Sequence, residues 1–260
     1  MFKIFTLVSL IVLFIVVVFS WKNLEAPAFE PEATPQGAVL SRSSSPKIAI
    51  ELNGHGYGVY WIEVDTVKTT LIPNFAAKRT SNSAFEEYGC KTIINGGFYA
   101  AGAHGPEPIG YFLASRDELS GFVRNRLFDG VLSLNELDTP RITREVPADP
   151  LVNAIQTGPI VWENGSEAKL SLVRDEHKRR MVAGVTGENK LIFMAIYSAD
   201  SVFAGPKLAE LPGIIAKLNV KEEMGLADVI NLDGGSASAL VTPEFSLSEA
   251  SPVGSFFCAK

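Results

Sequence analysis

Short apolar runs separated by polar, glycine-containing turns dominate the chain and predict many β-strands. Alternating or continuous apolar runs bounded by Gly, Asn or Asp are typical of strands. The two clearest runs flank a glycine-rich loop and predict a hairpin with strands at 47–52 and 59–64. Further strands are predicted at 91–94, 109–114, 130–134, 154–155, 160–162, 181–185, 191–195 and 229–232.

Helical spacing is confined to two segments. Residues 81–88 predict a short helix with Phe85 and Tyr88 facing inward. From 206 to 226, apolar residues recur three and four positions apart, and Pro212 predicts either a second helical start or a kink. We therefore expect an α+β fold: a mixed, mostly antiparallel β-sheet with a few packed helices, forming a single domain.

The N-terminal part has a different pattern. Ile4–Trp21 is almost unbroken in its apolar character, longer than a signal-peptide core and long enough to span a bilayer. Lys3 precedes this run and acidic residues follow it, which favours a cytoplasmic N-terminus. We interpret 1–21 as a transmembrane signal-anchor, with a signal peptide as the alternative, 22–46 as a disordered Pro/Ser/Glu linker and 47–260 as the domain. The domain is expected outside the cytoplasm, periplasmic or at the cell surface, and anchored to the membrane.

The charge and the cysteine and histidine content bear on three questions: nucleic-acid binding, disulfide formation and metal binding. The formal net charge of −6 offers no basic face, so nucleic acid is a poor candidate partner. Cys90 and Cys258 are the only cysteines; an oxidising compartment would allow a disulfide, and two separate thiols are the alternative. The three histidines lack ligand spacing, so a His/Cys metal site is not expected. The sequence contains no dedicated metal loop either, so no metal is predicted, with a divalent ion held by Asp233 as the alternative. No cofactor is predicted.

Two turns of similar design carry the candidate chemistry. Asn95-Gly96-Gly97-Phe98 and Asn231-Leu232-Asp233-Gly234-Gly235-Ser236 each follow an apolar strand. Paired glycines let a backbone take positive φ and bring N–H groups close to a ligand, so we interpret both turns as anion-binding rims. Ordinary glycine turns are the alternative. A nucleophilic-serine elbow is disfavoured because no histidine follows Ser236, and a nucleotide fingerprint because the required third glycine and helix are missing.

Two more blocks complete an ordered series: Gln156-Thr157-Gly158-Pro159, and Arg180 followed four residues later by Gly184. This series resembles the phosphodiester glycosidase family over roughly residues 48–245. The resemblance implies hydrolysis of the bond between a sugar's anomeric carbon and a phosphodiester oxygen. The substrate would be an envelope glycan, an exopolysaccharide or a related sugar phosphate. Family members often continue the last motif with a third glycine, where this chain has Ser236-Ala237-Ser238.

The resemblance implies three catalytic roles. Asp233 is the predicted base or nucleophile, Arg180 the phosphate clamp, and Asn95 the residue that orients the substrate. The planar fork of arginine matches two phosphate oxygens. A phosphate monoester has a second pKa of about 6 and can leave with little proton donation. One carboxylate could therefore suffice where ordinary glycosidases use two.

The other predicted site residues surround these three. Backbone N–H groups of the two glycine pairs would complete a cradle. Tyr99 is the predicted sugar platform, and Glu107 and His104 are candidates for a second acid. The predicted substrate-binding residues are Gly96, Gly97, Tyr99, Gln156, Thr157, Gly158, Asn231, Gly234, Gly235 and Ser236.

Each role has a simpler alternative. Asp233 could cap its own turn, and Arg180 could belong to the exposed charge run at 176–180. Gln156 and Thr157 could only hold their turn, and Glu107 could be a solvated loop residue. For the whole chain, the alternative to an enzyme is a non-catalytic glycan- or phosphate-binding envelope protein on the same scaffold.

Overall fold

The computed structural model of this 260-residue chain describes residues 42–102, 105–170 and 172–260. Across these ranges, no helix combines the length and apolar character needed to cross a membrane. The predicted signal-anchor at 1–21, most of the predicted linker at 22–46 and His104 lie outside the described residues. One compact unit spans Ser41–Lys260, and the finer domain boundaries stay a prediction.

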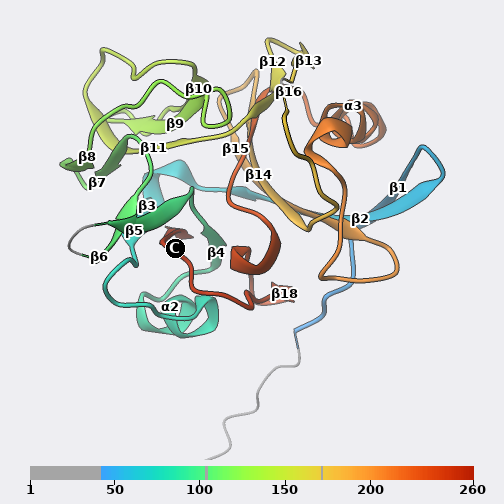
Figure 1. The fold of residues 1–260 in the computed structure, drawn as a ribbon, viewed down its shortest axis with the longest axis horizontal. Coiled ribbons are helices and arrows are strands. Elements are labelled where there is room, and N and C mark those ends of the chain that lie inside the picture. The colour runs from blue at the N-terminus through green and yellow to red at the C-terminus, as the bar shows by residue number, and fades with distance from the viewer. Residues whose placement is uncertain (1–41, 103–104, 171) are drawn as a thin grey trace, which may run out of the picture. The chain divides into compact units, whose positions relative to one another are not determined.

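Antiparallel sheets build this unit (Figure 1). The largest contains, in spatial order, β1 (Ile48–Leu52), β2 (His55–Val64), β15 (Leu191–Ser198), β14 (Arg180–Thr186), β16 (Leu226–Asn231), β12 (Ile160–Glu163) and β13 (Ser166–Glu167). A five-stranded sheet contains β10 (Pro140–Thr143), β9 (Gly130–Asn135), β11 (Leu151–Thr157), β7 (Phe112–Ala114) and β8 (Asp117–Ser120). Another contains β18 (Ser246–Leu247), β17 (Leu240–Val241), β4 (Thr92–Asn95), β19 (Ser255–Ala259) and β3 (Thr69–Pro73). The strands β5 (Tyr99–Gly102) and β6 (Gly105–Pro108) form a separate hairpin.

The helices are few and short. They are α2 (Ser81–Glu87), α3 (Leu211–Lys221) and the 3-10 turns η1 (Thr66–Lys68), η2 (Leu208–Glu210) and η3 (Gly235–Ala237). The fold is therefore mainly β, and the predicted α+β class is only approximate. All pairings between the named strands are antiparallel. The predicted mostly antiparallel arrangement is therefore confirmed, and only the predicted mixing with parallel strands was wrong. Pro212 lies in the first turn of α3, as its missing N–H allows, and confirms the predicted second helical start.

The first hairpin differs from its prediction in the length of the turn. Asn53 and Gly54 both have positive φ, 52° and 77°, and connect β1 directly to β2. Such a two-residue turn matches the natural twist of the strands. The glycine-rich stretch 55–58, which we expected to be loop, therefore belongs to the sheet and pairs with β1 and β15.

Two layers of apolar side chains bury the seven-stranded sheet on both faces. Met181 and Ala183 of β14 join a core shared with the other sheets, whereas Val182 joins the core beneath α3. This alternation follows from the two-residue period of a strand. Val182 pairs with Asn231 at the end of β16, so the start of β14 is fixed beside the turn that carries Asp233.

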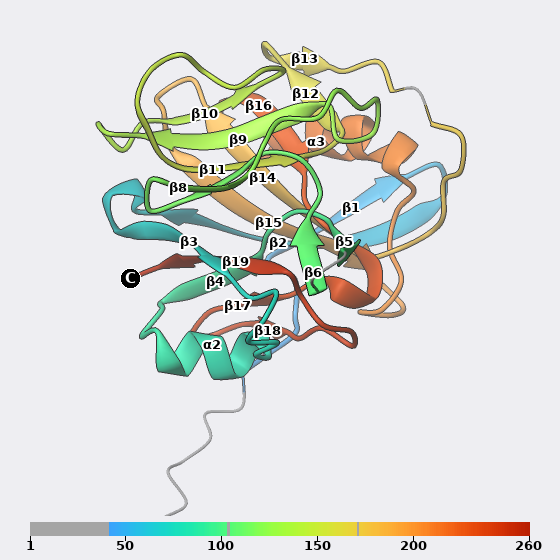
Figure 2. The same ribbon diagram turned by 60° about the vertical axis from the view of Figure 1, so that its left-hand side comes forward.

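The second five-stranded sheet holds the other predicted turn. Its strands β17, β4 and β19 lie beside α2, which packs Ala84 and Phe85 against it (Figure 2). Cys90, which precedes β4, forms a disulfide with Cys258 of β19. The structure therefore has the disulfide and not two separate thiols.

Candidate active site

Asn95 connects the two predicted turns. Its amide nitrogen donates to the carbonyl oxygen of Asp233 at 2.8 Å, and its side-chain oxygen accepts from the Ala239 N–H at 2.9 Å. The backbone N–H of Asp233 donates to the Gly96 carbonyl at 3.1 Å. The Asn95 side chain is fully buried. It therefore lies beneath the Asp233 turn and positions that turn, which corrects its predicted role of orienting the substrate directly.

Asp233 is a half-buried carboxyl with a perturbed proton affinity. Burial raises its pKa from an ordinary value of 3.8 to about 7. The Gly234 N–H, which donates to Oδ1 at 2.9 Å, and the charges of Lys178 and Arg180 oppose this rise. A carboxyl that titrates near neutral pH is suited to proton transfer.

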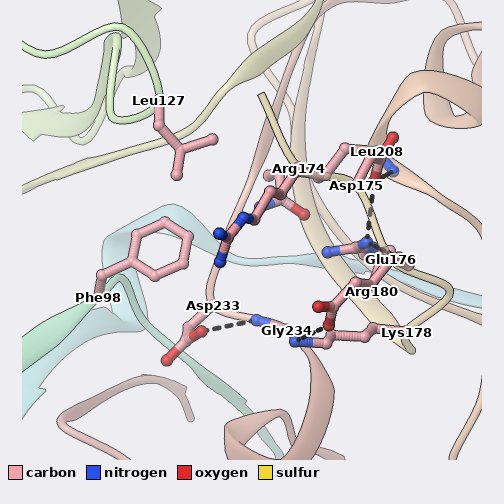
Figure 3. A pocket seen from close by; sticks show the side chains of 11 residues that line it. Phe98, Leu127, Arg174, Asp175, Glu176, Lys178, Arg180, Leu208, Asp233 and Gly234 are labelled. Carbon is pink, nitrogen blue, oxygen red and sulfur yellow. Dashed lines mark hydrogen bonds and ion pairs between the residues drawn. The ribbon is translucent and has the colours of Figure 1, made fainter. Parts of the chain in front are cut away.

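A cavity of about 250 Å³ opens at this carboxyl (Figure 3). Its walls come from both predicted turns, the loop before β9, the segment before β14 and η2. The lining residues are Phe98, Leu127, Arg174, Asp175, Glu176, Lys178, Arg180, Leu208, Asn231, Asp233 and Gly234. Three cations thus share one small cavity with Asp233.

Arg180 lines this cavity, but most of its guanidinium is already bound by other groups of the protein. Its Nε donates to the Pro206 carbonyl at 3.0 Å, and Nη2 donates to the Glu176 carbonyl. The Asp175 carboxylate is 3.5 Å from Nη2. The side chain is 8% exposed, so Arg180 is no surface member of a charge run. Nη1 is the part of its fork that remains for a ligand.

Arg179 points the other way, as expected for neighbours in an extended segment. It is buried and donates to both the hydroxyl and the carbonyl of Ser238 and to the carbonyls of Val202 and Ser248. Its own carbonyl accepts from the Gly235 N–H at 2.8 Å. Arg179 therefore holds the Asp233 turn from below.

The glycine pairs serve close packing more than anion binding. Only Gly235 of these four has positive φ, at 68°. The N–H groups of Gly96, Gly234 and Gly235 donate to Ser255, Asp233 and Arg179, so a cradle made by these N–H groups was wrong. A Cβ at Gly96 would clash with the Ser255 hydroxyl, and one at Gly97 would come within 3.1 Å of a carbonyl oxygen. Cationic side chains supply the positive wall instead.

Gln156, Thr157 and Gly158 lie behind the cavity and do not line it. Gln156 is buried and exchanges hydrogen bonds with the backbone of Val123 and donates to the Phe128 carbonyl, which fixes the loop that carries Leu127. The Thr157 hydroxyl donates to the Asn231 carbonyl at 3.0 Å. These residues hold their turn, so direct substrate binding by them was wrong.

Asn231 lines the cavity and has an unsatisfied side-chain acceptor. Its amide nitrogen donates to the carbonyls of Gly158 and Leu232, at 2.9 and 2.6 Å, which fixes the orientation of the side chain. Its Oδ1 is buried and accepts no hydrogen bond from the described residues. Buried acceptors normally have a partner, so this oxygen is a candidate to accept from a ligand hydroxyl or N–H.

The remaining predicted residues do not line the cavity. Phe98, and not Tyr99, lines the cavity; the Tyr99 hydroxyl donates to the Pro252 carbonyl, and the residue leads into the β5–β6 hairpin. Glu107 is exposed on that hairpin, and Ser236 is exposed on η3. Neither lines the cavity, and the prediction for His104 concerns a residue outside the described ranges.

Three charged residues that line the cavity had no predicted role: Arg174, Asp175 and Lys178. They lie in the irregular segment between β13 and β14, where no periodicity or glycine motif marks a site. Their only signal was the density of charge before Arg180. In the part of the chain that the structure describes, no three His, Cys, Asp or Glu side chains are grouped to hold a metal ion.

Comparison with known proteins agrees with this geometry. A family described as phosphodiester glycosidase matches residues 88–258, well over half of the chain. This chain belongs to the phosphodiester glycosidase family. The resemblance inferred from the four motifs is thereby confirmed. No curated protein matches the chain in sequence.

Solved structures share the fold at low sequence identity. The catalytic domain of zebrafish N-acetylglucosamine-1-phosphodiester alpha-N-acetylglucosaminidase, auto-inhibited by its pro-peptide, is 16% identical with a TM-score of 0.61, over 82% of this chain and 80% of that one. A hypothetical protein from Synechocystis is 14% identical with a TM-score of 0.62, over 81% and 60%. A putative exported protein from Burkholderia pseudomallei is 10% identical with a TM-score of 0.56, over 79% and 74%.

Proposed function

We propose that this protein is an extracytoplasmic hydrolase that cleaves a sugar-1-phosphodiester, at the bond between the anomeric carbon and the phosphate oxygen. The substrate would be an envelope glycan, an exopolysaccharide or a related sugar phosphate. The observation that carries the proposal is Asp233, whose pKa is raised to about 7 in a cavity shared with three cationic side chains. Family membership supports the same reaction class.

The geometry divides the cavity into two halves suited to such a substrate. Arg174, Lys178 and Arg180 provide a positive wall for the phosphate. The unsatisfied Oδ1 of Asn231 would repel phosphate oxygens and accept a hydrogen bond from the sugar. Phe98 and Leu127 add apolar surface, which suits the face of a sugar ring. A phosphodiester of a sugar presents these features side by side.

Asp233 acts in its ionised form, as the base that takes a proton from water or as the nucleophile. The phosphate leaves with the bonding electron pair, because its second pKa of about 6 makes it a good leaving group without a second acid. We therefore expect kcat/KM to rise with pH and to level off above about 7, the pKa of the Asp233 carboxyl.

The location is part of the proposal. The domain would lie in the periplasm or at the cell surface, held by the N-terminal apolar segment. The Cys90–Cys258 disulfide supports this, because such bonds persist in oxidising compartments.

The test is hydrolysis of a set of sugar-1-phosphodiesters, including activated aryl esters, by the full chain and by Asp233→Asn. We expect the substitution to lower kcat by about a hundredfold or more with substrate still bound. Asp228→Asn is the matched control, since Asp228 also accepts a backbone N–H but at the opposite end of β16. Binding of sugar phosphates without any turnover of the activated esters would favour the non-catalytic alternative.

A further inference from the structure

Arg174 stands apart from the other cations of the cavity. It lies in the strap, defined here as residues 172–178, which leads to β14. The residue is exposed, yet its side chain lines the cavity, and Figure 3 shows its guanidinium directed toward the region of Phe98 and Asp233. Within the described ranges, no acidic group forms an ion pair with Arg174, and no hydrogen bond engages its guanidinium.

The backbone of the strap is fixed on both sides of this arginine. Leu172 packs against the apolar core beneath α3. The two carboxylate oxygens of Asp175 accept the N–H groups of Leu208 and Ala209, at 2.8 and 2.9 Å. The Arg174 guanidinium is therefore free to engage a ligand while its Cα is held in place. Such preorganisation lowers the entropy lost on binding.

Arg180 differs in each of these respects. Its Nε and Nη2 are engaged by the carbonyls of Pro206 and Glu176, and Asp175 partly balances its charge. It can offer a ligand the two protons of Nη1, whereas Arg174 can offer the whole fork. Since Arg180 holds both Glu176 and Asp175, its main effect on the cavity is to position the strap.

Lys178 is a weaker candidate for the same contact. Its Nζ lies 2.8 Å from the Glu176 carboxylate, so part of its charge is neutralised. A lysine ammonium also lacks the planar pair of donors that matches two phosphate oxygens. Among the three cations of the cavity, Arg174 is thus the one whose fork takes part in no ion pair or hydrogen bond within the described residues, although its charge contributes to lowering the pKa of the neighbouring Glu176 carboxyl.

We propose that Arg174 is the residue that binds the departing phosphate, an assignment that rests on the proposed hydrolysis. In that reaction the bond from the anomeric carbon to the phosphate oxygen breaks, and its electron pair stays on the oxygen. Water supplies the new oxygen at the anomeric carbon and its proton passes to Asp233. The phosphate goes from one negative charge to two, so a contact with Arg174 strengthens in the transition state and accelerates the reaction.

The test compares Arg174→Ala, Arg174→Lys and the control Arg141→Ala on one sugar carrying phosphodiester leaving groups of graded acidity. Arg141 lies on β10, pairs with Asp149 and does not line the cavity. We expect Arg174→Ala to lower kcat/KM by about a hundredfold, as loss of one transition-state donor does, with the largest loss on the poorest leaving group. Arg174→Lys should recover part of the rate. Equal rates for Arg174→Ala and Arg141→Ala on every substrate would overturn the assignment.

A measurement of phosphate affinity tests the role of Arg174 independently of whether the protein is a hydrolase. Inorganic phosphate should bind wild type and Arg141→Ala equally in calorimetry, and Arg174→Ala about tenfold more weakly, as for the loss of one charge-assisted contact. If the wild type turns over no substrate, the hydrolytic proposal fails. If phosphate affinity is unchanged in Arg174→Ala, the phosphate site at Arg174 fails, whatever the turnover.

Discussion

Replacing Asp233 by asparagine should stabilise the folded chain at alkaline pH while it removes activity. The folded state raises the pKa of this carboxyl from 3.8 to about 7, chiefly through burial. A raised pKa means that the folded chain holds the proton more tightly than the unfolded chain. The stabilisation by the protonated form is complete below pH 3.8 and is lost as the pH rises through about 7.

The size of the effect follows from the same two values. At about 1.4 kcal/mol for each pH unit, the rise from 3.8 to about 7 corresponds to about 4 kcal/mol, of which about 3 kcal/mol falls between pH 5 and pH 8. Asparagine is uncharged at both pH values and keeps an oxygen that can accept the Gly234 N–H. Asp233→Asn should therefore gain up to about 3 kcal/mol relative to the wild type between pH 5 and pH 8.

Denaturant or thermal unfolding at the two pH values measures this gain. For a chain of this size, about 3 kcal/mol means that the Tm of Asp233→Asn relative to the wild type should be about 6–12 °C higher at pH 8 than at pH 5. Asp228→Asn reports the effect of removing another carboxylate from the same strand. If Asp233 only caps its turn, the asparagine variant will show the same stability difference from the wild type at pH 5 and pH 8. That result would refute the buried-carboxyl interpretation.

Three further perturbations test the surroundings of the site. Gly96→Ala should lower the free energy of unfolding by about 1–3 kcal/mol in urea, because its Cβ would overlap the Ser255 hydroxyl; an unchanged urea midpoint would contradict this packing. The Cys90–Cys258 disulfide closes a loop of 168 residues, so its reduction should lower the free energy of unfolding in urea by about 2–5 kcal/mol. Equal stability with and without reductant would contradict a stabilising role for this disulfide. Asn231→Ala should lower kcat/KM about tenfold for a substrate whose sugar keeps all its hydroxyl groups, and much less for analogues that lack one of them. Equal losses on both kinds of substrate would argue against a hydrogen bond from a sugar hydroxyl to Oδ1.

Local patterns in the sequence located most of the sheet. The strands β9, β12, β14, β15 and β16 were predicted near their observed positions because buried strands are recognisable as short apolar runs. The strands β3, β17, β18 and β19 were not predicted, because they are short or carry no distinctive alternation. Apart from the pairing of β17 with β18, their partners are distant in sequence, and such pairings leave little local signal.

The motifs predicted where the candidate site lies but not what each residue does there. Asn95, Gln156 and Thr157 do not line the cavity. Their side chains bond to backbone groups of the segments that form its walls. Which face of a strand end meets the cavity depends on the register with neighbouring strands, and one residue of shift exchanges the faces. That is also why Phe98 lines the cavity in place of Tyr99.

The sequence by itself determined the family and the order of the strand-end motifs, and it singled out Asp233 as the candidate carboxylate, because these depend on residue identity and local spacing. Only the tertiary structure decided how Asp233 titrates and which cations share its cavity. The raised pKa arises from burial by segments far apart in the chain. Arg174 enters the site from a segment without any motif, because Asp175 fastens that segment to η2.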